Sequence, residues 1–153
     1  MMNTDYNEQL KKEHRTLVVA FFNAVEKKAD DRELSAKMLF DMAKEKGLTD
    51  KTEMSADWLR NRVYQPEKYK TLPLWLAKSA YHQLLKIEGW QPSKNSEWFA
   101  MIALFVKERG GDKPNFEDLK SCLPQNLDGE LGFKWLRVCV DEVRKIQQQR
   151  EAQ

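Results

Sequence analysis

The sequence feature that most constrains the fold is a run of nine apolar residues, WFAMIALFV, at Trp98–Val106. The run is about half as long as the ~20 residues that a membrane-spanning helix needs, so we expect no membrane segment. A helix built from it has no polar face and must be buried nearly all round. Short apolar runs also suit buried strands, but no neighbouring segment offers a partner strand. We therefore expect a buried central helix near 96-108.

The rest of the chain carries apolar residues at helical spacing, and its few glycines and prolines fall between the periodic segments. Asp30 and Glu33 form a capping-box pattern at the start of the second segment. The fold class predicted is all-α, a compact bundle of six or seven helices in a single domain over 1–153. The GWQPSKNS turn separates two possible halves, 1–89 and 96–150. The other helices are expected over 4–28, from Asp30 to Gly47, from Ser55 to Tyr64, from Pro73 to Gly89, near 115–122, and from Leu131 into a frayed tail.

Composition is that of a globular protein, with 41% apolar and 33% charged residues. Two cysteines, Cys122 and Cys139, are too few for a disulfide framework, and we expect them to be reduced thiols. The first residues lack the basic head and apolar stretch of a secretory signal. These features together favour a cytoplasmic protein.

Motifs for catalysis are absent from the sequence, which has no GxGxxG, GxxxxGK[ST] or GxSxG pattern. A zinc site would have to draw His14, His82, Cys122 and Cys139 together in space, without the closely spaced ligand pairs that structural zinc sites usually show. We retain that site only as a minor alternative. We expect a protein that is not an enzyme and that needs no cofactor and no metal.

Positive charge is concentrated in one part of the chain. Six basic residues and one acidic residue lie between Arg60 and Lys86, whereas the whole chain has a net charge of only +2. A local basic excess of this kind is expected of a surface that contacts phosphates, and also of one that contacts an acidic protein.

The segment Ser55–Tyr64 lies at the start of this basic region. Leu59 and Val63, four residues apart, can anchor a short helix. We expect Arg60, Asn61 and Tyr64 to project outward, with Arg62 nearer the flank. Arg and Asn side chains read guanine and adenine edges, and an exposed aromatic ring can stack on a base. The candidate nucleic-acid-binding residues are Arg60, Asn61, Arg62, Tyr64, Lys68 and Lys70.

The five tryptophans are expected to pack in the core, because all lie within or beside apolar stripes. Among them, only Trp58 also lies among basic residues, which makes it a candidate for base stacking.

Ala43 and Gly47, at the end of the second helix, resemble the first helix and turn of a helix-turn-helix. The resemblance covers 34–64 and implies that 55–64 is the recognition helix. The intervening LTDKTEM is several residues longer than the tight turn of that motif.

Two functional hypotheses follow. The first is a small helical protein that binds DNA or RNA through the surface at 55–86, for example a phage or mobile-element regulator. The alternative is a helical protein-interaction module that acts through a protein partner: a small subunit of a ribonucleoprotein or CRISPR-type complex, an adaptor or an inhibitor. The sequence leaves the oligomeric state open.

Overall fold

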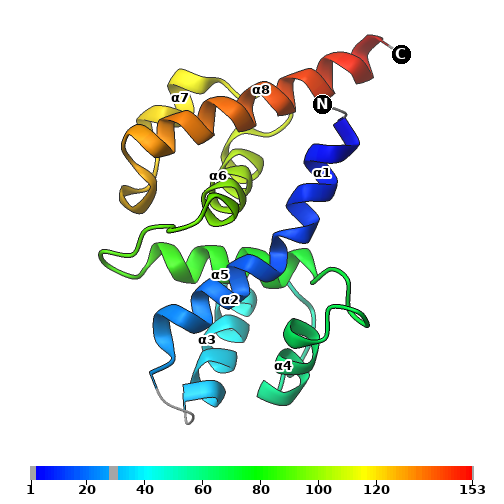
Figure 1. Cartoon of the computed structure of the whole chain (residues 1–153), viewed down its shortest axis with the longest axis vertical. Helices are drawn as coiled ribbons and strands as arrows, with labels where there is room; N and C mark the ends of the chain where they lie inside the picture. Colours follow the sequence, from blue (N-terminus) through cyan, green and yellow to red (C-terminus); the bar gives the residue numbers. More distant parts are fainter. Residues whose placement is uncertain (1–2, 28–30, 153) are drawn as a thin grey trace. The chain divides into compact units, whose positions relative to one another are not determined.

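The computed structural model describes residues 3–27 and 31–152 (Figure 1). These residues form helices and connecting segments and no strand, which confirms the all-α class. The helices are α1 (Asn3–Lys12), α2 (His14–Val25), α3 (Asp31–Glu45), α4 (Ala56–Tyr64), α5 (Leu74–Leu85), α6 (Asn95–Gly110), α7 (Phe116–Ser121), the single-turn 3-10 helix η1 (Gln125–Leu127) and α8 (Glu130–Ala152).

The helix predicted over 4–28 is divided at Glu13 into α1 and α2. If α1 and α2 are counted as one interrupted helix, the described residues carry seven α-helices, within the six or seven expected. Asp30, the predicted capping residue, and Lys28, the predicted end of the first helix, lie outside the described residues.

The chain divides into two units, residues 1–10 with 91–153, and residues 11–90. The organisation expected from the sequence, a single domain over 1–153, stays a prediction.

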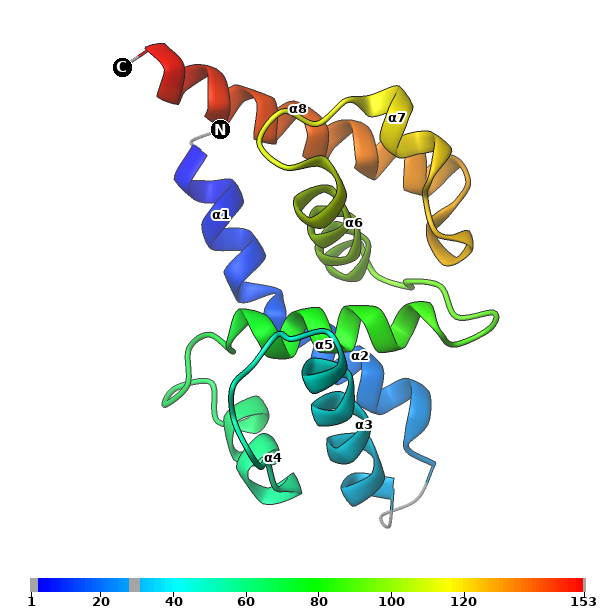
Figure 2. The same cartoon turned by 180° about the vertical axis from the view of Figure 1, so that it is seen from behind.

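In the unit formed by residues 11–90, α5 packs against both α2 and α3, and α4 packs against α3 (Figure 2). The core between them is apolar and includes Leu17, Phe21, Leu39 and Leu76, none of which is exposed. Local signals set the helix ends. Gly47 adopts a left-handed conformation with φ 66°, and the Leu48 N–H donates to the Ala43 carbonyl at 2.8 Å, which is the Schellman pattern.

In the other unit, α6 supplies the buried helix that the sequence predicts. Every residue from Trp98 to Val106 is at most 9% exposed. The helix packs against α8, and α7 lies along α8 (Figure 1). Phe99 contacts the ring of Tyr6 at 5.6 Å and the ring of Trp135 at 6.3 Å between centroids, so aromatic contacts link α6 to α1 and to α8.

The end of α8 differs from the expected frayed tail, because α8 stays helical to Ala152. The Glu151 carboxylate accepts a hydrogen bond from the Gln147 amide at 3.3 Å and lies 3.2 Å from the Lys113 ammonium. Within the described ranges, no helix combines the length and the apolar character needed to cross a bilayer.

Candidate binding surface on α4 and the loop after it

Ser55 and Pro66 bound α4 as the sequence predicts. The Ser55 hydroxyl accepts a hydrogen bond from the Trp58 N–H at 3.0 Å and caps the first turn. The helix ends at Tyr64, two residues before Pro66. Leu59 and Val63 are both buried, as expected, and hold α4 against the core.

Arg15, on α2, holds the end of α4 and the loop that follows. Its guanidinium donates to the carbonyls of Val63 at 2.7 Å, Arg62 at 3.1 Å and Lys70 at 3.3 Å, and also to that of Tyr69. The last carbonyls of a helix lack partners within the helix and carry its partial negative charge, so a cation there is favourable. Burial lowers the pKa of Arg15, although an arginine keeps its proton in proteins.

Arg60 does not project outward as the sequence led us to expect. Its side chain is 13% exposed and forms an ion pair with Glu26, at the end of α2. The guanidinium carbon lies 3.7 Å from the centre of the Phe22 ring. The Ser35 hydroxyl also donates to Glu26. Arg60 therefore joins α4 to α2 and α3, and we leave it out of the candidate surface.

Arg62 lies between two aromatic rings. Its guanidinium carbon is 4.0 Å from the centre of the Trp58 ring and 4.7 Å from that of the Tyr69 ring. The Trp58 ring in turn stacks on Trp75, with centroids 6.2 Å apart and planes 22° apart. Trp75, Trp58, Arg62 and Tyr69 form a continuous row, which we call the aromatic row. All four side chains are half-buried.

Lysines surround the aromatic row. The Lys51 ammonium lies 5.0 Å from the centre of the Trp58 ring, and the Lys68 ammonium lies 5.4 Å from that of the Tyr69 ring. Lys70 is exposed on the loop after α4, which also carries Lys68. Cations above ring faces are favourable contacts, and at such exposed positions each contributes about 0.5–1 kcal/mol.

The outward face of α4 is not basic. Its exposed residues are Asp57, Asn61 and Tyr64, of which Tyr64 is 58% exposed. Asn61 accepts a hydrogen bond from the Gln65 amide at 3.5 Å, and the Tyr64 ring is tilted against Phe22 at 6.4 Å between centroids. The positive charge therefore lies on the flank of α4 and on the loop after it.

The connection between α3 and α4 differs from that of a helix-turn-helix. The two helices pack together, but residues 46–55 separate them, where that motif has a turn of three or four residues. Because the outward face of α4 also carries an acidic residue, the flank is the better candidate for contact with phosphates.

The residues considered for zinc are engaged elsewhere. His14 is buried and its Nδ1 lies 2.7 Å from the Leu72 carbonyl oxygen, while the His82 ring contacts that of Tyr81. Over residues 3–27 and 31–152, no three or more His, Cys, Asp or Glu side chains are grouped so that they could hold a metal ion.

Arg15, Lys51, Tyr69 and Trp75 were not identified from the sequence. Trp75 was expected in the core with the other tryptophans, and Tyr69 was not singled out although it lies within the basic region. Arg15 carried no signal, since its carbonyl partners follow it by 47 to 55 residues.

Comparison of the whole chain with protein-family models, with curated proteins and with solved structures gave no match.

Proposed function

We propose that this protein binds single-stranded nucleic acid, DNA or RNA, along the aromatic row and the loop after α4. The observation that carries the proposal is the row itself: half-exposed rings in line, with cations between and beside them. Proteins that hold single strands combine aromatic rings on which bases stack with a positively charged path for the backbone.

Each part of the surface has a role in this proposal. Trp75, at the end of the row, offers a ring face for stacking, and Trp58 and Tyr69, whose faces contact Arg62, offer their exposed edges. Lys68 and Lys70 contact phosphates. Asn61 and Tyr64, on the adjoining outward face of α4, contact neighbouring bases or sugars. Arg62 fixes the spacing of the rings, because it is held between Trp58 and Tyr69.

The proposal is tested by fluorescence anisotropy with labelled oligo-dT and oligo-U over a series of salt concentrations. One double variant carries Lys68→Gln and Lys70→Gln. A control double variant carries Lys94→Gln and Lys134→Gln, both in the other unit. All four lysines are exposed. Each pair removes the same charge, so only the position of that charge differs.

We expect the log–log salt slope of the Lys68/Lys70 variant to be smaller by roughly 1.4, at about 0.7 for each phosphate contact on a single strand. The control variant should keep the slope of the unmodified protein. Absence of a complex at low salt, or equal effects of the two double variants, would rule out this surface. A single protein partner recovered in stoichiometric amount after nuclease treatment would favour the interaction-module alternative.

A further inference from the structure

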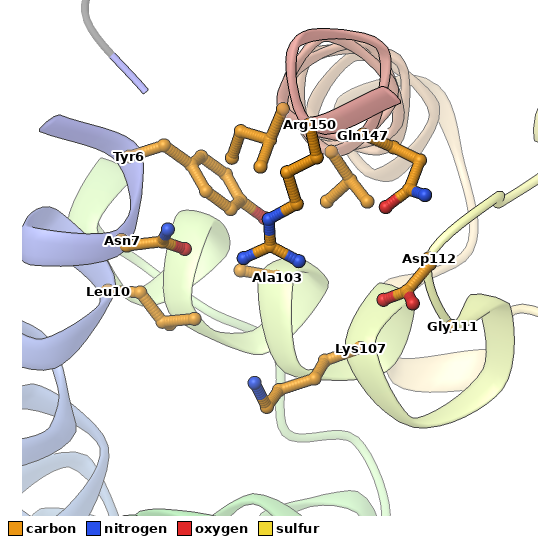
Figure 3. Close-up of a pocket in the computed structure, with 11 residues that line it drawn as sticks. Tyr6, Asn7, Leu10, Ala103, Lys107, Gly111, Asp112, Gln147 and Arg150 are labelled. Atoms are coloured by element: carbon orange, nitrogen blue, oxygen red, sulfur yellow. The ribbon is translucent and has the colours of Figure 1, made fainter. Parts of the chain in front are cut away.

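The unit formed by residues 1–10 and 91–153 contains a cleft lined by apolar and charged side chains. This cleft, of about 150 Å³, opens between α1, the end of α6 and α8 (Figure 3). Leu10, Ala103, Val143 and Ile146 contribute its apolar lining. A cavity of this volume holds a molecule about the size of benzene.

Two cations face the cleft. Arg150 extends from α8 into its middle, and Lys107 enters from α6 (Figure 3). Neither side chain forms an ion pair or a hydrogen bond with any other residue that the structure describes. Two like charges that line one small cleft repel each other, and a bound anion would offset that repulsion.

Further polar side chains that line the cleft include those of Tyr6, Asn7 and Asp112. Tyr6 is 5% exposed and forms a side-chain hydrogen bond with Cys139. Burial, together with the nearby Cys139 and Glu142, raises the pKa of the Tyr6 phenol far above its ordinary value. The phenol therefore stays protonated and uncharged. Asn7 adds an amide on one side of the cleft, and Asp112 adds a carboxylate on the other (Figure 3).

We propose that this cleft binds a small organic carboxylate with an apolar body of four to six carbon atoms. The apolar body lies on the aliphatic lining, and the carboxylate accepts hydrogen bonds from Arg150 and Lys107. Charge-assisted hydrogen bonds of this kind are about twice as strong as neutral ones. The single acidic group, Asp112, leaves the lining with a net positive charge.

The test is a two-dimensional NMR titration of the full chain with 3-methylbutanoate, and with 3-methylbutylamine as a probe that has the same carbon skeleton and the opposite charge. We expect saturable shifts at residues lining the cleft for the carboxylate and none for the amine. Equal binding of the two probes, or no saturable shift with the carboxylate, would overturn the proposal.

Two variants are expected to change the affinity for the carboxylate in opposite directions. Lys107→Gln with Arg150→Gln should weaken carboxylate binding by about tenfold or more, while Asp112→Asn should strengthen it roughly twofold because a like charge is removed. Lys94→Gln with Lys134→Gln serves again as the control and should leave affinity unchanged. Unchanged affinity in Asp112→Asn together with unchanged affinity in the double variant would refute the assignment. No nucleic acid enters the measurement, so its outcome is separate from that of the proposed function.

Discussion

Arg60 and Arg62 are two positions apart on α4 and have different surroundings. Arg60 is nearly enclosed by Glu26 and Phe22, whereas Arg62 lies on the half-exposed aromatic row. The difference follows from helix geometry, because residues two apart point to different sides of a helix.

We expect Arg60→Ala to lower the free energy of unfolding by about 2 kcal/mol, because it leaves the partly buried Glu26 carboxylate without its cation. Urea denaturation measures the loss. A double-mutant cycle with Glu26→Gln separates the pairwise energy from the effect of each change alone. Additive effects of the two substitutions would contradict the importance of this pair.

The two thiols should differ in reactivity. Cys139 is fully buried, and burial raises its pKa to about 12, whereas Cys122 is exposed. Because only the thiolate reacts, we expect one thiol per chain to react with an aromatic disulfide reagent at mildly alkaline pH, and two after denaturation. Two fast-reacting thiols in the folded protein would contradict the burial of Cys139.

The raised pKa of Cys139 also predicts how the free energy of unfolding changes with pH. A buried thiol favours its neutral form, so its contribution is fully present below the pKa of the unfolded thiol, near 9. That contribution is lost as the pH rises from about 9 toward 12. Cys139→Ala should lessen the fall in the free energy of unfolding over this range, as followed by urea denaturation at a series of pH values.

At the scale of the elements, the end of α3 and both ends of α4 were predictable from sequence, whereas the contacts between helices were not. Ser55 and Gly47 act through their own backbone neighbours, so their roles could be identified directly. Arg60 and Arg15 act on residues 34 and 48 positions away. No local pattern reports such partners, which is why the expected outward direction of Arg60 was wrong and the role of Arg15 was missed.

The aromatic row was predictable only in part for a related reason. Trp58 was recognised as a candidate, but its stacking on Trp75 depends on how the start of α5 meets α4. Arg62, Lys68 and Lys70 were identifiable because positive charge is concentrated between Arg60 and Lys86 in the sequence, whereas Lys51 lies outside that region. The sequence therefore indicated that the surface is positively charged, but it identified only Trp58 among the three rings of the aromatic row.

Gly132, near the start of α8, gives a test of packing between elements. Helix propensity alone predicts that Gly132→Ala stabilises the protein by up to about 1 kcal/mol. In the structure, a Cβ atom there would lie 1.7 Å from the Leu127 carbonyl oxygen. We expect instead a destabilisation of about 3 kcal/mol, since backbone must move to relieve the overlap. Thermal and urea denaturation distinguish the two signs.

At the scale of the whole molecule, the proposed surface lies entirely within the unit formed by residues 11–90. The tryptophans provide a readout for each unit, because Trp58, Trp75 and Trp90 belong to this one, and Trp98 and Trp135 belong to the other. Trp98 is only 7% exposed.

We expect oligo-dT to quench fluorescence from Trp75 by stacking and from Trp58 by contact with its exposed edge, with little effect on the other unit. Phe substitutions at Trp58 and Trp75 should therefore remove most of the quenching, while Trp98→Phe and Trp135→Phe retain it. Equal losses in both sets would place the bound strand elsewhere.

The hydrogen bonds from Arg15 end on backbone carbonyls, and a carbonyl is present whatever side chain its residue carries. The path of the loop after α4 is thus largely independent of the identity of its outward side chains. Substitutions at Lys68 and Lys70 can then alter the charge that the loop presents without altering its course. A loop built in this way can diversify quickly under selection, while Arg15 itself is expected to tolerate little change.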